Sequence, residues 1–178
     1  MINGLVGLPL KRHLTLLAIL LCLPLGARAV DSASVEVGHG TGKTNLLRFG
    51  LQWKGHTTWF ETTNWHVVHY MDLAAGGWDN GVHTVYDLGV TPVFRFERSS
   101  GSPFFEAAIG FHAVSNLDFE HGRETSTRFQ FGDHVGFGFR LDGRNELVFR
   151  LQHLSNGGIR NPNPGINFLQ LRLQHDLR

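Results

Sequence analysis

The chain has very little cysteine. Its only cysteine, Cys22, falls in an apolar stretch near the N-terminus, Leu14 to Leu25, which basic residues precede and the triplet Ala27-Arg28-Ala29 follows. A charged segment, a short apolar run and an A-x-A site together predict a secretory signal peptide, residues 1–29. The mature chain, residues 30–178, then has no cysteine. This absence excludes both disulfides and a thiol nucleophile.

Long apolar runs and an excess of positive charge are also lacking. After residue 29, no stretch reaches the roughly 20 apolar residues that a membrane helix needs. Of the 16 basic residues, Lys11, Arg12 and Arg28 belong to the signal peptide, so 13 remain against 15 acidic residues. A nucleic-acid-binding domain is normally basic, so this balance argues against a nucleic-acid partner.

What the mature chain does contain is a series of segments with alternating apolar and polar residues. In one of them, Leu47, Phe49 and Leu51 share one face while Arg48 and Gln52 share the other. Several of these segments have about the 9–11 residues that a tilted strand needs to cross a bilayer. The series predicts eight strands: Val35–Val37, Asn45–Trp53, Thr57–Tyr70, His83–Glu97, Phe105–Ala113, Phe129–Arg140, Asn145–Ser155 and Leu169–Gln174. The third has broken alternation, which we attribute to a bulge.

A soluble sandwich and a membrane barrel both produce such alternation, and the connections distinguish them. Three connections read as tight turns: Lys54-Gly55, Ser99–Ser102 and Asp142–Arg144. Four read as longer loops: Gly38–Thr44, Met71–Val82, Ser115–Glu124 and Asn156–Gly165. Short and long alternate along the chain, as in outer-membrane barrels. We therefore predict an all-β fold, an eight-stranded antiparallel transmembrane β-barrel of the bacterial outer membrane.

The strand Asn145–Ser155 changes from apolar to reactive along one face. Leu147, Phe149 and Leu151 share their face with His153 and Ser155, at the end of the strand that is predicted to reach the outer rim. An imidazole and a hydroxyl two residues apart can form a nucleophile and its base. A His-x-Ser tripeptide alone is more often an ordinary polar pair. Its position facing lipid favours a functional role, because unpaired polar groups there are unfavourable.

A carboxylate is predicted at the same height on the neighbouring strand. A three-residue turn Asp142–Arg144 pairs Leu141 with Asn145 and sets Asp133 opposite His153. Asp133 is then either a third catalytic residue or a solvated rim carboxylate.

These residues carry a family resemblance. His153–Ile159 (HLSNGGI), followed by Asn161–Ile166 (NPNPGI), resembles the signature of the lipid A deacylases of the PagL family, and Phe131-Gly132-Asp133 resembles an upstream motif. The resemblance spans essentially the whole mature chain. It implies an enzyme of the Gram-negative outer membrane that removes the 3-O-linked acyl chain from lipid A of the outer-leaflet lipopolysaccharide. It also implies no metal or other cofactor, and a possible homodimer.

The resemblance assigns roles to individual residues. His153 matches the catalytic histidine and Ser155 the nucleophile, while Asn156 and Asn163 match polar residues near the site. One of these, or a backbone N–H between Asn156 and Gly158, is expected to stabilise the oxyanion.

The chain departs from the family pattern at one position, where Asn167 replaces the glutamate of the better-known member. An amide oxygen can orient an imidazole but cannot stabilise imidazolium by charge. Either Asn167 orients His153 or Asp133 supplies the charge, and we favour Asn167. The alternative from another class is a non-enzymatic barrel with a structural or adhesion role, which would be indifferent to the loss of Ser155.

Overall fold

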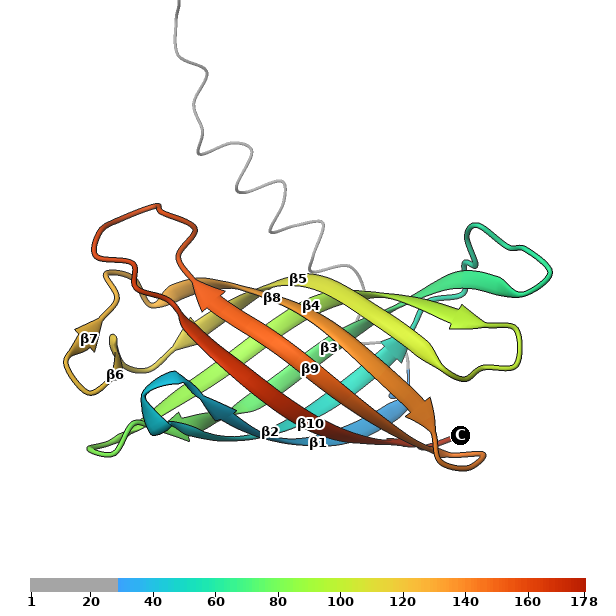
Figure 1. The fold of residues 1–178 in the computed structure, drawn as a ribbon, viewed down its shortest axis with the longest axis horizontal. Coiled ribbons are helices and arrows are strands. Elements are labelled where there is room, and N and C mark those ends of the chain that lie inside the picture. Colours follow the sequence, from blue (N-terminus) through green and yellow to red (C-terminus); the bar gives the residue numbers. More distant parts are fainter. Residues whose placement is uncertain (1–28) are drawn as a thin grey trace, which may run out of the picture.

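The computed structural model describes residues 29–178, and residues 1–28 of the predicted signal peptide lie outside this part. Eight antiparallel strands close into a barrel (Figure 1). They are β1 (Ser32–Gly40), β2 (Asn45–Lys54), β3 (Trp65–Asp79), β4 (Thr84–Arg98), β5 (Phe104–Val114), β8 (Phe129–Arg140), β9 (Asn145–Ser155) and β10 (Ile166–Asp176). Each strand pairs with its neighbours in sequence, and β1 pairs with β10 to close the barrel. The predicted fold class is confirmed.

The connections divide between the two ends of the barrel. The C-terminus and the connections β2–β3, β4–β5 and β8–β9 lie at one end, called the terminal end here (Figure 1). The other connections lie at the opposite, loop end: a 3₁₀ turn at Thr41–Lys43, the β3–β4 turn, the β5–β8 segment and the β9–β10 loop. The β5–β8 segment carries a small hairpin of its own, formed by β6 (Asp118–Glu120) and β7 (Arg123–Glu124).

The outer wall is apolar and the interior largely polar, as the alternation predicts. Phe49, Ile109 and Leu151 point outward with 60%, 65% and 60% of their surface exposed, whereas Arg48 and Arg150 are buried inside. A closed sheet leaves no free strand edge, so the backbone hydrogen bonds of the wall are satisfied within it. No helix in residues 29–178 is long and apolar enough to cross a membrane.

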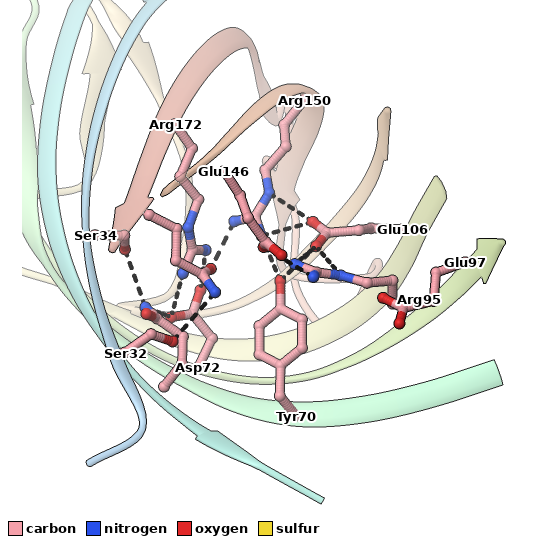
Figure 2. Close-up of polar contacts among 12 residues, drawn as sticks. Ser32, Ser34, Tyr70, Asp72, Arg95, Glu97, Glu106, Glu146, Arg150 and Arg172 are labelled. Carbon is pink, nitrogen blue, oxygen red and sulfur yellow. Dashed lines mark hydrogen bonds and ion pairs between the residues drawn. The ribbon is translucent and has the colours of Figure 1, made fainter. Parts of the chain in front are cut away.

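Buried ion pairs fill the middle of the interior (Figure 2). Arg150 donates to Glu36 and to Glu106, each at 2.8 Å, and also to the Tyr70 hydroxyl at 2.8 Å. Arg172 reaches Asp72 at 2.7 Å on the opposite side of this cluster. Because each charge has a partner, the cost of removing it from water is offset, and the strands are tied together across the barrel.

An apolar plug closes the interior at the loop end. It consists of buried side chains from six strands of the barrel and from the β6–β7 hairpin: Leu46, Trp78, Val85, Val114, Phe119, Leu154, Ile166 and Phe168. The Trp78 indole packs edge-on against Phe119, with ring centroids 5.3 Å apart, and donates a hydrogen bond to the Phe119 carbonyl at 3.0 Å. The plug therefore fixes the hairpin over the barrel mouth.

The third strand and its two connections correct the sequence prediction. The strand runs over Trp65–Asp79 instead of Thr57–Tyr70, so the β2–β3 connection is long, residues 55–64, and the β3–β4 turn is short, residues 80–83. Gly76 and Gly77 read as loop residues, yet they lie where neighbouring strands approach: a Cβ on Gly76 would be 2.2 Å from the Leu47 carbonyl oxygen. Short and long connections therefore alternate less regularly than predicted.

Residues 57–64, the part of the predicted strand that lies outside β3, contact β3 through Trp59. Trp59 forms an isolated bridge with Val67 and stacks on His69, with ring centroids 4.7 Å apart. Its Trp and Thr content resembles a strand, but residues 57–64 form no strand and pair with β3 at this isolated bridge.

The β8–β9 turn has the predicted register. Leu141 N–H donates to the Asn145 carbonyl at 2.8 Å, and Asp133 pairs with His153. The Asp142 carboxylate accepts hydrogen bonds from the Asn145 side chain at 2.7 Å and from the backbone N–H groups of Arg144 and Asn145. These bonds hold the pKa of Asp142 below its usual value. The turn is thereby fixed, and with it the residues that face each other along β8 and β9.

Candidate active site

His153 and Asn167 form a hydrogen-bonded pair on the outer wall at the loop end. They are direct cross-strand neighbours on β9 and β10, and His153 Nδ1 lies 2.7 Å from Asn167 Oδ1. Because a carbonyl oxygen only accepts, Nδ1 carries the proton, and the lone pair of the neutral ring is on Nε2. The pair therefore presents a base at Nε2, as predicted for an orienting Asn167.

Asp133 lies on the other side of His153, also as predicted. It is the cross-strand partner of His153 on β8, and it is exposed. Within residues 29–178, however, no hydrogen bond joins its carboxylate to the imidazole, whose partner is Asn167. The geometry thus gives Asn167 the contact with the ring and leaves Asp133 as a neighbouring charge.

Ser155 is the last residue of β9, two positions beyond His153 on the same face. It is half-buried and lies opposite Phe131 on β8. In the described part of the chain its hydroxyl makes no hydrogen bond to the imidazole. Such bonds are often long in the absence of substrate and tighten when it binds. The strand thus places a hydroxyl beside the base without yet joining the two.

The β9–β10 loop is built around Asn156, which is fully buried. Its backbone N–H donates to Asn163 Oδ1 at 2.9 Å, and its Oδ1 accepts from the Gly158 N–H at 2.9 Å. Its Nδ2 donates to the Arg160 carbonyl at 2.7 Å and to the Ser126 hydroxyl at 3.0 Å. The side chain of Asn156 and the Gly158 N–H are therefore already used inside the protein, whereas no hydrogen bond within residues 29–178 engages Asn163 Nδ2.

Ser126 is a site residue that the sequence did not reveal. Its hydroxyl donates to the Arg160 carbonyl at 2.7 Å while accepting from Asn156. It lies in the β5–β8 segment, 30 residues from Asn156, and no local pattern marks it. The loop that follows Ser155 is thus braced by the segment that precedes β8.

A hollow of about 820 Å³, called the wall hollow here, opens beside the His153–Asn167 pair. Small and branched side chains, Ala107, Val135 and Leu151, form its apolar part, and Asp133 also lines it. Aromatic side chains flank it along the strands. Toward the loop end, Phe111, Phe129 and Phe131 have ring centroids 5.1–5.9 Å apart, and toward the terminal end Phe105 and Phe137 lie 5.0 Å apart. Polar side chains line the hollow at its loop end, with His153 and Asn167 on one side of it and His39 on the other.

The chain is similar to known proteins of one family. The sequence model of the family described as Lipid A 3-O-deacylase (PagL) matches residues 46–176. A relative named Lipid A deacylase PagL, from Bordetella bronchiseptica, is 40% identical over 145 residues, which cover 77% of this chain and 79% of the relative. A relative of the same name from Pseudomonas aeruginosa is 29% identical over 163 residues, covering 89% and 93%.

A solved structure is similar as well. The crystal structure of the outer membrane enzyme PagL superposes with a TM-score of 0.76 at 27% identity, covering 82% of this chain and 99% of that one. The family match spans well over half of the chain, and its barrel fold agrees with the one described above. This chain therefore belongs to the lipid A 3-O-deacylase (PagL) family.

Proposed function

We propose that this chain hydrolyses the 3-O-linked acyl ester of lipid A with Ser155 as nucleophile and His153 as general base. Members of its family are outer-membrane enzymes that deacylate lipid A, and the chain is one of them. The observation that carries the catalytic assignment is the 2.7 Å contact between His153 Nδ1 and Asn167 Oδ1, next to Ser155 on a lipid-facing wall. A base held in one tautomer beside a hydroxyl is what acyl transfer needs.

The reaction follows from these positions. His153 Nε2 removes the proton from Ser155 as Oγ attacks the ester carbonyl, and the resulting oxyanion collapses to an acyl-enzyme. The imidazolium returns its proton to the departing sugar oxygen. A water molecule, deprotonated by the same imidazole, then attacks the acyl-enzyme and releases the fatty acid and free Ser155.

The best-placed side-chain donor for the oxyanion is Asn163. Its Oδ1 is held by the Asn156 N–H, so its Nδ2 is the end of the amide left to donate. Asn156 and Gly158 act differently in this scheme: they hold the loop that carries Asn163, because their own donors are already engaged. Donors held in place before the reaction stabilise a developing charge without reorganisation.

The wall hollow suits the acyl chain of the substrate. A second hollow of about 420 Å³ shares Val135, Leu151 and Leu169 with it and continues to the aromatic side chains Phe105, Phe137 and Phe149. An acyl chain that enters these hollows from the bilayer exchanges contacts with other lipid chains for contacts with apolar side chains. Binding therefore needs no pocket inside the barrel. The ester at its head then lies at the loop end, beside His153, with the sugar at the level of the outer headgroups.

Mass spectrometry of lipid A from cells that express the chain tests this function. We expect loss of one 3-O-linked acyl chain with the wild type and no loss with Ser155→Ala, which removes the nucleophile but contributes little to folding. A heat-dependent gel shift, typical of folded barrels, confirms that both proteins are folded. Equal deacylation by the two proteins would contradict the role of Ser155, and no deacylation by the folded wild type would contradict the proposed function.

A further inference from the structure

In the part of the chain that the structure describes, the outer wall carries three pairs of histidine and asparagine with the same geometry. In each pair the two residues are direct cross-strand neighbours, and Nδ1 of the imidazole contacts Oδ1 of the amide. The pairs are His153–Asn167 at 2.7 Å, His39–Asn45 at 3.0 Å and His175–Asn145 at 2.9 Å. Each therefore fixes the proton on Nδ1 and leaves Nε2 free to bind another group.

Two of these pairs belong to the loop end, and both of their histidines line the wall hollow. His39 and His153 face it from strands β1 and β9, with β10 between them. The β1–β2 turn and the β9–β10 loop lie at the same end of the barrel (Figure 1). Two strand spacings, roughly 10 Å, separate their strands, and His39 lies level with Leu151, two residues nearer the terminal end than His153. A ligand that reaches from Ser155 across β10 therefore meets His39, whereas His175 lies at the terminal end.

The His39 pair has the base of an active site but not its nucleophile. Thr41 follows His39 at the spacing at which Ser155 follows His153, so His-x-Thr repeats His-x-Ser. The Thr41 hydroxyl, however, donates to the Glu120 carboxylate of the β6–β7 hairpin. With its hydroxyl held there, the pair is suited to binding and not to acyl transfer.

We propose that the His39–Asn45 pair is a second binding contact for the lipid, in which His39 Nε2 accepts a hydrogen bond from a hydroxyl group of the bound molecule. This inference rests on the proposed function, because the lipid A bound for deacylation is the molecule contacted. Asn45 holds the proton on Nδ1, so the neutral ring offers a lone pair at Nε2, and the hydrogen-bond donors of an acylated glucosamine are mainly its hydroxyl groups. His39 is exposed and lines the wall hollow beside apolar side chains, where an imidazole is unfavourable unless it has such a partner.

Steady-state kinetics of the full-length mature enzyme in detergent test the proposal. His39→Phe keeps a ring of similar shape but removes the acceptor, so we expect KM to rise about 3- to 10-fold with kcat changed less than about twofold, the pattern of a lost binding contact. Asn45→Ala keeps the imidazole but releases its orientation, so KM should rise less. His175→Phe is the matched control: it removes an equivalent pair far from the hollow and should leave both constants unchanged.

Two substrates locate the hydroxyl that is bound. They are lipid A with a 3-hydroxyacyl chain at position 3 and the same lipid with an unhydroxylated chain there. If His39 contacts the chain, the effect of His39→Phe disappears on the second substrate; if it contacts the sugar, the effect persists on both. Either result supports the proposal, whereas a KM for His39→Phe equal to that of His175→Phe on both substrates overturns it.

A binding measurement separates this inference from the proposed function. Lipid A binding to Ser155→Ala, with and without His39→Phe, requires no turnover. If the wild type deacylates lipid A and His39→Phe does not weaken lipid A binding to Ser155→Ala, only the role of His39 is refuted. A folded wild type that does not deacylate refutes the proposed function, whatever His39 does.

Discussion

Asn167 and Asp133 are competing candidates for the group that supports His153, and two substitutions distinguish them. Asn167→Ala removes the acceptor that lies 2.7 Å from Nδ1 and frees the ring to turn or to change tautomer. Removing the carboxylate of a serine-protease triad costs about 10⁴ in turnover. Asn167 supplies orientation but no charge, so its loss should cost less: about 10- to 100-fold in kcat, or about 1.4 to 2.7 kcal/mol.

Asp133→Asn should have a small effect by comparison. The carboxylate is exposed and makes no hydrogen bond to the imidazole within the described residues, so we expect a change below about threefold. Asn167→Glu, which restores the acid of the family pattern, should retain or raise activity by stabilising imidazolium. Deacylation rates in detergent, with folding checked by gel shift, measure all three. An active Asn167→Ala enzyme beside an inactive Asp133→Asn enzyme would refute this reasoning.

Three further substitutions test the surroundings of the site. Gly165→Ala should abolish activity while the barrel still folds. The φ of Gly165 is +63°, and a Cβ there would lie 2.5 Å from Cε1 of His153, so the imidazole would be displaced. Normal turnover would contradict that packing. Ala107→Phe should fill the wall hollow and raise KM at least several-fold without a change in urea stability, and an unchanged KM would exclude the hollow as the acyl site. Arg150→Met should lower the free energy of unfolding by about 3 kcal/mol, because it leaves the buried carboxylates of Glu36 and Glu106 without this cationic partner. Urea titration of the folded barrel measures this change.

The strand faces were predictable because alternation depends only on neighbouring residues. The position of Asn167 beside His153 followed from parity, and that of Asp133 opposite His153 from the turn after Leu141, so this part of the candidate site could be located before any coordinates. The third strand could not be placed, since Gly76 and Gly77 are small where adjacent strands come close, and single-sequence patterns assign such residues to loops.

Other parts of the site depend on residues that are distant in sequence. The wall hollow requires side chains from β1, β5, β8, β9 and β10 to leave a space together, and its volume is not a property of any one segment. The brace from Ser126 to the Arg160 carbonyl joins two loops that strands β8 and β9 separate in the sequence. Local periodicity carries no information about either feature.

The filled interior has a consequence for the cell that carries this protein. In residues 29–178, ion pairs occupy the middle of the barrel and the apolar plug closes its loop end, so we expect the interior to offer ions and small solutes no continuous water path. A barrel closed in this way can be present in many copies without weakening the permeability barrier of the membrane. Planar-bilayer recordings should accordingly detect no conductance, and its expression should not by itself admit antibiotics through the barrel.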